Sequence, residues 1–325
     1  MSGYTIDMID VGQGDAFIVA GGKNTCLIDV GPRSTSDSVI QHINKHFDGQ
    51  ISAVLLTHVD DDHIGGLEKV LKAGIKPRIV FVNDPASVFE ASFEKHASAY
   101  ASNDIKKVIT EEKGKLLTAS VKTQSRILDM LCQRRILHHT AFAGKRIRLT
   151  DELHLKILSP SEEVFSQLVQ DFTSSNLRYL RELVKSAASS AENSSSIVLE
   201  AVYEGERPER ALFTGDAGID VLEHLATRQY AWVKIPHHGS RSGLDATLLA
   251  KWKPKIAALS HGSRYDHPAP AIMNALRANK TRIYCTRCHG TVRFRRAGAP
   301  VKPGWERIES ACHCKARKQS SPVRK

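Results

Sequence analysis

The chain contains one unusual stretch, Thr57-His58-Val59-Asp60-Asp61-Asp62-His63-Ile64-Gly65-Gly66. Three consecutive carboxylates between two histidines would repel one another unless a bound cation became the largest local charge. The apolar run at 51–56 predicts a buried strand before the stretch, and the two glycines lead into a short helix over 67–72. The polar residues would then lie between a strand end and a helix start, where loops on a rigid scaffold carry chemistry. An acidic cap for the helix, the alternative, explains one carboxylate but neither histidine.

The composition predicts a soluble globular protein. The chain has 325 residues, of which 41% are hydrophobic and 25% charged, enough for a core that needs no disulfides. No apolar run approaches the ~20 residues that cross a bilayer, and residues 1–7 lack the features of a signal peptide. We therefore expect a cytoplasmic protein without membrane contact, whose six cysteines are reduced thiols or metal ligands.

The charge favours an anionic partner. The formal net charge is +11 and the pI is about 9.4, and nucleic acid is the commonest partner of such a protein. Part of the excess lies in a basic C-terminal tail at 311–325, which would otherwise be a solvated end.

The strand pattern predicts an α+β fold in one domain over 1–310. Residues 4–30 have the glycine turns of an antiparallel meander, and later apolar runs end repeatedly in Asp or His. Such a layout gathers ligands at one edge of a pair of sheets, as in a four-layer αββα sandwich. Helical insertions are expected at about 86–140 and 161–190, as lid, partner surface or padding. The final strands are expected at 281–285 and 291–295.

Three loops supply candidate metal ligands. The stretch at 57–66 contributes four, a second loop contributes Asp216, and a third contributes His237. Imidazole and carboxylate together suit zinc, manganese or iron, and six ligands exceed what one tetrahedral ion needs. Two ions roughly 3.5–4 Å apart, bridged by Asp216, would use the set better. The full set is His58, Asp60, Asp62, His63, Asp216 and His237.

These motifs resemble those of a known family. The stretch Thr57–Gly66 is similar to the metal motif of the metallo-β-lactamase superfamily, in the variant where aspartate replaces the second histidine. Further stretches look like one branch, the hydrolase domain of ComEC-type DNA-uptake proteins. The resemblance covers roughly residues 4–85 and 145–295. The matching stretches are Asp10–Ala16, Leu27–Gly31, Ser194–Leu199, Leu212–Asp216, Lys234–Ser240 and Asp266–Pro268.

The resemblance implies a metal-dependent hydrolase, most simply a dinuclear nuclease or phosphodiesterase acting on nucleic acid, in DNA processing or defence. It carries the six ligands over, and Asp62, His238 and His267 are expected to serve catalysis, since a histidine near neutral pKa can donate to an oxyanion or protonate a leaving group. For His238 a satisfied loop histidine remains the alternative. The chain has Asn193 and serines where most members supply a further histidine, which favours manganese over zinc.

Two other functions stay open. The same scaffold could hydrolyse a small ester, thioester, lactam or nucleotide, because fold does not fix substrate. Alternatively, the chain could be a non-catalytic or partner-activated subunit that docks into a complex through the helical insertion at 86–140.

The C-terminal cysteines suggest a second metal site. The run Cys285-Thr286-Arg287-Cys288-His289 matches the pattern of c-type haem attachment, which takes place outside the cytoplasm and is therefore set aside. With Cys312 and Cys314, the pair Cys285 and Cys288 could instead form a structural zinc site of four thiolates. The resemblance implies that the strands at 281–285 and 291–295 form a hairpin that closes the fold, and zinc would then pin the start of the tail to this hairpin.

Overall fold

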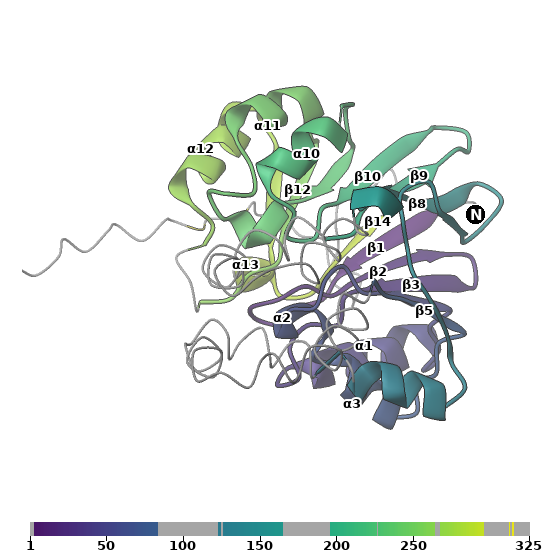
Figure 1. Ribbon diagram of the computed structural model, residues 1–325. Helices are drawn as coiled ribbons and strands as arrows, with labels where there is room; N and C mark the ends of the chain where they lie inside the picture. The colour runs from purple at the N-terminus through teal and green to yellow at the C-terminus, as the bar shows by residue number, and fades with distance from the viewer. Residues whose placement is uncertain are drawn as a thin grey trace, which may run out of the picture.

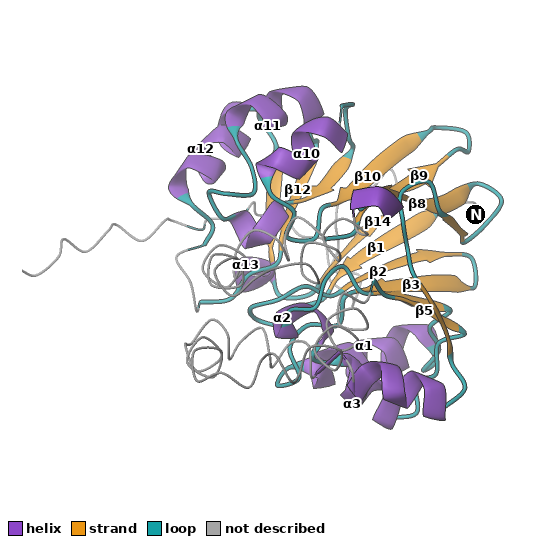
Figure 2. Ribbon diagram, in the orientation of Figure 1, coloured by secondary structure: helices purple, strands orange, loops and turns teal. Residues whose placement is uncertain are grey.

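The computed structural model describes residues 3–83, 123–124, 126–164, 196–225, 227–263, 267–295, 312 and 314. In this part of the chain two seven-stranded sheets pack face to face, and helices cover their outer faces. Helices α10, α11 and α12 lie together on one side of the sheets, and α1 and α3 lie on the other (Figures 1 and 2). The predicted αββα sandwich is therefore confirmed.

The first sheet has the strand order β14-β1-β2-β3-β4-β5-β6. Strands β1 to β3 form the expected antiparallel meander, whereas β3, β4, β5 and β6 run parallel to one another. The strands are β1 (Tyr4–Met8), β2 (Phe17–Gly21), β3 (Asn24–Ile28), β4 (Ala53–Leu55), β5 (Ile79–Phe81), β6 (Leu137–His139) and β14 (Val292–Arg295).

The second sheet repeats this plan in the order β13-β12-β11-β10-β9-β8-β7. Strands β7 to β10 are antiparallel, and β10 to β13 are parallel. Each sheet thus has a parallel half whose carboxyl ends lie at one edge. The strands are β7 (Arg146–Arg148), β8 (Leu153–Ser159), β9 (Val198–Tyr203), β10 (Glu209–Phe213), β11 (Trp232–Lys234), β12 (Ile256–Leu259) and β13 (Arg282–Cys285).

The helices end where the sequence supplies stop and start signals. Asp48, in the left-handed conformation, ends α1. The side chain of Asp245 accepts a hydrogen bond from Leu248 N and caps α11, while Pro270 opens α12, where its missing N–H costs nothing. The helices are α1 (Ser36–Phe47), α2 (Asp61–Ile64), α3 (Leu67–Lys72), α10 (Ile219–Leu225), the 3₁₀ turn η1 (Pro236–Gly239), α11 (Ala246–Trp252), α12 (Pro270–Ala278) and α13 (Thr286–His289).

Three apolar cores hold the layers together. Between the sheets, Phe17, Phe213 and Trp232 pack edge to face or tilted, with ring centroids 4.8–5.9 Å apart. A second core lies under α1 and α3, and a third lies under α10 to α12 around the fully buried Trp252. This packing fixes the relative position of the two sheets, and with it the position of the loops at their common edge.

Two expectations about the chain's course need correction. The helical insertion predicted for 86–140 includes strand β6, which pairs in parallel with β5. All three β6 side chains are exposed, so no apolar alternation marked this edge strand. Residues 126–133 are helical, but residues 84–122 lie outside the described part of the chain. The same is true of residues 165–195, which include most of the insertion predicted for 161–190.

The predicted closing hairpin is also wrong. Strand β13 pairs with β12 in the second sheet, whereas β14 pairs with β1 in the first. The helical turn α13 carries the chain from the second sheet to the first, so the two strands do not pair; only their side chains Tyr284 and Phe294 meet between the sheets, with ring centroids 5.7 Å apart. In the tail predicted for 311–325, only Cys312 and Cys314 are described. Within the described residues, no helix has the length and apolar character needed to span a bilayer.

Candidate metal centre

Polar side chains converge where the parallel strands of both sheets end. Asp29 follows β3 and His58 lies three residues beyond β4, while Asp216 and His238 follow β10 and β11. Helix α2 adds Asp62 and His63. The packing of the sheets therefore brings together residues that are up to 209 positions apart (29 to 238).

Asp29 orients His63. Its Oδ2 accepts a hydrogen bond from Nδ1 of His63 at 2.8 Å, and Asp29 also accepts from the backbone N and the hydroxyl of Thr57 at 2.7 Å each. All three residues are buried. With Nδ1 acting as the donor, Nε2 of His63 keeps its lone pair, and it lies 3.5 Å from Oδ2 of Asp216.

The same arrangement holds for two further imidazoles. Because the Thr57 hydroxyl donates to Asp29, Nδ1 of His58 donates to Thr57 Oγ1 at 3.0 Å. In His238, Nδ1 donates to the carbonyl oxygen of Ser260 at 2.7 Å. Both Nε2 atoms are thereby left as acceptors, which is how a protein presents histidine to a metal ion.

These lone pairs meet in one buried space. Within the described residues, Nε2 of His58, His63 and His238 is buried without a hydrogen-bond partner. Leaving such groups unsatisfied costs about 1–3 kcal/mol each, and a shared cation removes that cost. The groups whose ligand atoms all lie within 4.8 Å of one another include His58, His63 and Asp216, and Asp62, His63 and His238. The donor set therefore fits divalent metal ions.

A buried lysine offsets part of the negative charge. Nζ of Lys234 lies 2.5 Å from Oδ2 of Asp15 and 3.1 Å from Oδ1 of Asp216, and it donates to Gly215 O. Burial lowers the pKa of the ammonium, but the two carboxylates hold the pKa of Lys234 above its ordinary value. Asp216 thus has one oxygen on the lysine and the other turned toward the imidazoles.

The surroundings favour positive charge. Burial lowers the pKa of His63, but Asp216 and Asp29 hold that pKa well above its ordinary value. For His238, Asp216 and Asp15 outweigh burial and raise the pKa to about 10. Conversely, burial raises the pKa of Asp216, but His238, Lys234 and His63 hold it well below its ordinary value. A divalent ion would take the place of the protons that this site otherwise attracts.

His237 and His267 lie at the rim of this space. Nε2 of His237 lies 3.9 Å from Oδ2 of Asp216, its side chain is 27% exposed, and it belongs to neither ligand group. The centroid of the His267 ring lies 6.0 Å from that of His237, and nearby the backbone N of Ala269 donates to the carbonyl oxygen of Gly239. Burial lowers the pKa of both rings.

Comparison with known proteins identifies the fold of this chain. The model of the metallo-beta-lactamase superfamily matches residues 9–126. The chain has the metallo-beta-lactamase fold. It is 24% identical over 320 residues to ComE operon protein 3 of Bacillus subtilis (strain 168), and the match covers 89% of this chain and 33% of that protein. The chain thus spans about a third of the length of this curated relative.

Two solved structures extend the comparison. The metallo-beta-lactamase fold protein YhfI from Bacillus subtilis gives a TM-score of 0.51 at 9% identity, over 91% of this chain and 100% of that one. A diphosphatase from the PhnP family gives a TM-score of 0.44 at 14% identity, over 90% of this chain and 98% of that one. The family match and the ligand groups support a metal-dependent hydrolase that holds divalent ions.

Among the predicted ligands of this metallo-beta-lactamase fold, His58, Asp62, His63 and Asp216 come together. Asp60 is partly exposed, with Oδ2 3.5 Å from Nε2 of His58. Asp61, which is not among the predicted ligands, is exposed. The structure brings His238 into the inner group and leaves His237 at the rim. The ligand role of His237 stays a prediction that this geometry does not favour.

Sequence reasoning gave no role to several residues of the site. Asp15, Asp29 and Lys234 stood within the matching motifs, but no pattern in the chain showed that their side chains meet the ligands. Ser196, just before β9, is buried, and within the described residues its hydroxyl has no hydrogen-bond partner. The signal that could have identified Asp29 was its position just after a buried strand, which resembles the position of Asp216 after β10.

Proposed function

We propose that this chain is a metal-dependent nuclease or phosphodiesterase that acts on nucleic acid with two divalent ions, manganese or zinc. One observation carries the proposal: three buried imidazoles direct free Nε2 lone pairs into a space shared with Asp62 and Asp216. The motif resemblance to the hydrolase domain of ComEC-type proteins points to the same substrate class.

Different residues of the chain would bind the ions, orient the imidazole rings and compensate the buried charge. His58, His63 and Asp216 form one group of ligand atoms, and Asp62, His63 and His238 form a second, so these residues would hold the ions. Asp60 lies beside His58 and could add a further oxygen. Bound there, the ions would activate water and neutralise charge on a phosphoryl group. Asp29, Thr57 and Ser260 keep the three rings in the ligating tautomer. Lys234 compensates the buried carboxylates of Asp15 and Asp216 without occupying the oxygen that faces the rings.

The rim suits contact with a phosphodiester. His237 and His267 face each other at the edge of the ligand space, where an imidazole can donate to a phosphate oxygen or pass a proton to a leaving oxygen. Arg241 is exposed three residues beyond His238 on the same loop. A guanidinium there can bind a phosphate in bidentate fashion.

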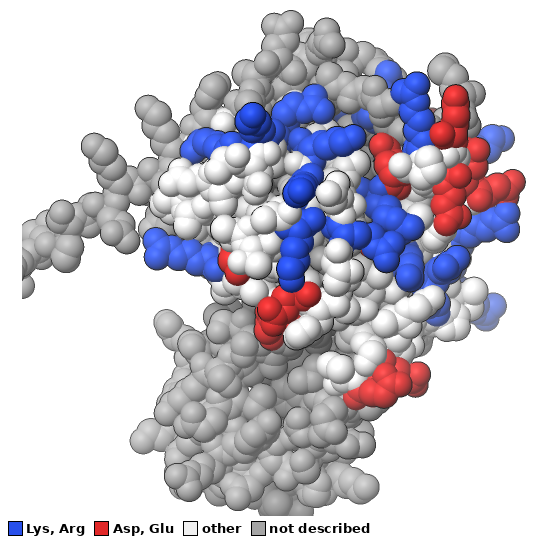
Figure 3. Space-filling view, turned by 90° about the horizontal axis from the view of Figure 1, so that it is seen from above, with Lys and Arg blue, Asp and Glu red and all other residues white. Residues whose placement is uncertain are grey.

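Positive charge is spread over one face of the molecule. Figure 3 shows Lys and Arg side chains across the face seen from above, with Asp and Glu in a few separate groups. Such a field attracts the phosphate backbone regardless of sequence. Exposed basic residues in and next to α11, α12 and β13 include Lys251, Lys253, Lys255, Arg277, Lys280 and Arg282.

A cleavage assay tests the proposal. The purified protein, stripped and then supplied with Mn²⁺, Zn²⁺ or Mg²⁺, is incubated with linear, circular and single-stranded DNA, with RNA, and with a nitrophenyl phosphodiester and a nitrophenyl acetate ester. Asp216→Asn removes a shared ligand with little change in shape. Asp61→Asn, an exposed carboxylate of the same loop, is the matched control.

We expect metal-dependent cleavage of a nucleic acid that Asp216→Asn abolishes and Asp61→Asn retains. Hydrolysis of the acetate ester alone would overturn the substrate class and favour a small-ester hydrolase. Salt-sensitive binding of nucleic acid without cleavage under any metal would instead favour a partner-activated or non-catalytic subunit.

A further inference from the structure

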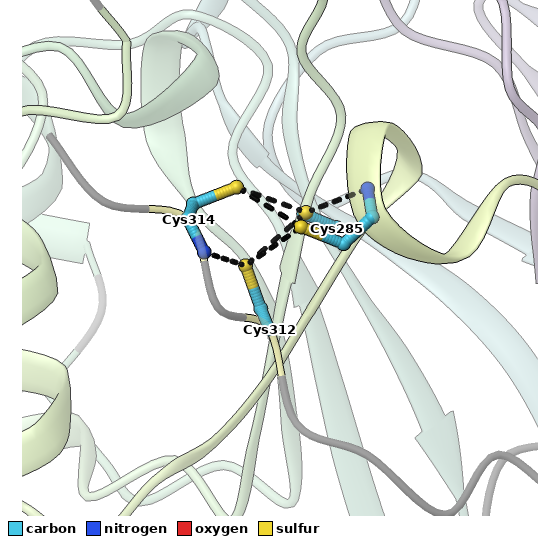
Figure 4. A group of neighbouring side chains, drawn as sticks. Cys285, Cys312 and Cys314 are labelled. Atoms are coloured by element: carbon cyan, nitrogen blue, oxygen red, sulfur yellow. Dashed lines mark hydrogen bonds between the residues drawn. The ribbon is translucent and has the colours of Figure 1, made fainter. Parts of the chain in front are cut away.

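Four cysteine side chains from two distant parts of the chain meet next to α13. Sγ of Cys285 lies 3.2 Å from that of Cys312 and 3.4 Å from that of Cys314, and Sγ of Cys288 lies 3.7 and 3.3 Å from the same two atoms. All four sulfurs lie within 4.8 Å of one another. Figure 4 shows the sulfurs of Cys285, Cys312 and Cys314 turned toward a common point.

These separations fit a single tetrahedral ion. With zinc–sulfur bonds of about 2.3 Å, the four sulfurs of such a site lie about 3.8 Å apart. The sulfurs need to move apart by only a few tenths of an ångström to reach that geometry. A four-iron cluster would put each thiolate on a different iron and spread the sulfurs further. Disulfides would instead require a separation of about 2.05 Å.

Backbone donors point at the sulfurs. Cys285 ends β13 and caps α13, and its Sγ accepts from the backbone N of Cys288 at 3.3 Å. Sγ of Cys312 accepts from the backbone N of Cys314, also at 3.3 Å. N–H groups aimed at sulfur stabilise the thiolate form, which is the form that binds metal. In each pair, the backbone N–H of the second cysteine therefore supports the sulfur of the first.

The cluster fastens a distant part of the chain to the second sheet. The backbone N of Cys312 donates to the carbonyl oxygen of Ile283 at 2.9 Å, at the edge strand β13, and Cys312 is buried in the core under α12. Arg277 of α12 donates to the carbonyl oxygen of Cys314 at 3.4 Å. Residues 312 and 314 thus dock where the chain had left the sheet more than twenty residues earlier.

The cluster also lies behind a part of the metal centre. Sγ of Cys314 is 3.7 Å from Nε2 of His261, and the backbone N of His261 donates to the hydroxyl of Thr286 in α13 at 3.1 Å. The preceding residue, Ser260, accepts the hydrogen bond from Nδ1 of His238. A short path of contacts therefore joins the thiols to an imidazole that faces Asp216.

We propose that Cys285, Cys288, Cys312 and Cys314 bind one structural zinc ion, which holds residues 312 and 314 at β13 and supports the loop at 260–261 behind His238. The four thiols give up four protons when zinc binds and become thiolates. The ion closes the coordination shell with protein ligands alone, so its role is to hold structure and not to catalyse.

Metal release and cobalt substitution test the site. A mercurial reagent that reacts with thiols should free one equivalent of zinc from the wild-type protein and from Asp216→Asn. It should free none from Cys288→Ser, whose side chain is exposed and whose substitution leaves the core intact. Cobalt in the wild type should show the thiolate-to-metal absorption of a tetrahedral sulfur site, and Cys312→Ser/Cys314→Ser should lose it. Cys132→Ser, an exposed cysteine elsewhere, is the matched control.

Two results would overturn the proposal. Equal zinc release from the wild type and Cys288→Ser would place the metal elsewhere. A native mass spectrum showing no zinc and the loss of four hydrogen masses would show that the thiols form two disulfides instead. Because Asp216→Asn keeps all four cysteines, the outcome is independent of the catalytic centre.

Discussion

Oδ2 of Asp29 lies 2.8 Å from Nδ1 of His63, and the same carboxylate holds the backbone and hydroxyl of Thr57. One aspartate therefore sets the orientation of both His63 and, through Thr57, His58. We expect Asp29→Asn to weaken metal binding about 10–100-fold, as the loss of such an outer partner does in other metal sites. Competition with a chromophoric chelator measures the affinity. Asp37→Asn, on the exposed start of α1, should leave it unchanged, and an unchanged affinity in Asp29→Asn would refute the role of Asp29.

The two neighbouring histidines of η1 should differ in their effect on metal content. His238 faces Asp62 and Asp216 at 3.4 and 3.5 Å, whereas His237 lies at the rim. We expect His238→Ala to lose about one metal equivalent per chain, measured by elemental analysis after dialysis, as one ion loses a ligand. His237→Ala should keep its metal and lose turnover. The reverse result would make His237 the ligand.

Gly14 allows two loops of the site to approach. Its φ is +135°, Asp15 N donates to Asp62 O, and a side chain on Gly14 would overlap that carbonyl oxygen. Gly14→Ala should therefore displace α2 and lower metal affinity while unfolding remains cooperative. Gly12 also has a positive φ, but a side chain at this position would meet open space. Gly12→Ala should therefore cost only about 1–2 kcal/mol of stability, and the protein should retain its metal. Equal metal affinity in the two variants would contradict this reading.

Arg241 is expected to bind a phosphate of the substrate. Because it is exposed on the loop of His238, Arg241→Gln should reduce the slope of log K against log salt for DNA binding by about 1. Turnover of a small phosphodiester should stay the same. Lys23→Gln, in the turn at the opposite end of the strands, should change neither quantity. Fluorescence anisotropy at several salt concentrations distinguishes the two variants.

A buried ion pair should govern acid stability. Arg293 donates two hydrogen bonds of 2.6 Å to Asp7, and Nε2 of His42 lies 2.7 Å from the same carboxylate. Burial raises the pKa of Asp7, but the bonds from Arg293 and His42 hold it below its ordinary value. The stability that this adds is present above about pH 4, the unfolded pKa, and is lost as pH falls through the lower folded pKa.

Asp7→Asn should therefore lower the free energy of unfolding at pH 7 by about 3–5 kcal/mol, since it leaves Arg293 buried without its counter-charge. It should also flatten the fall in stability below pH 4. Urea titrations over a pH series measure both effects. Asp37→Asn breaks the exposed pair with Lys69 and should change stability by less than about 1 kcal/mol. A similar loss in both variants would contradict the argument.

The sequence by itself determined the fold class and pointed to most of the side chains that come together at the site. Strands that end in Asp or His, together with the run of three aspartates between histidines, predicted a metal site at one edge of a sheet pair, because strand periodicity and metal chemistry are local properties of the chain. The four cysteines at 285, 288, 312 and 314 were likewise paired from spacing alone, and their sulfurs do meet.

The tertiary structure decided what depends on distance between elements. Two adjacent histidines are equivalent in the sequence, but the left-handed turn at 237–238 turns His238 inward to Ser260 and leaves His237 at the rim. The role of Asp29 emerged when pairing of β3 with β4 brought it to Thr57 and His63, and that of Lys234 emerged when the packed sheets brought it to Asp15. Strand β6 and the separation of β13 from β14 were missed for the same reason: hydrogen bonds to a partner strand, and not the apolar pattern of the segment, fix an edge strand.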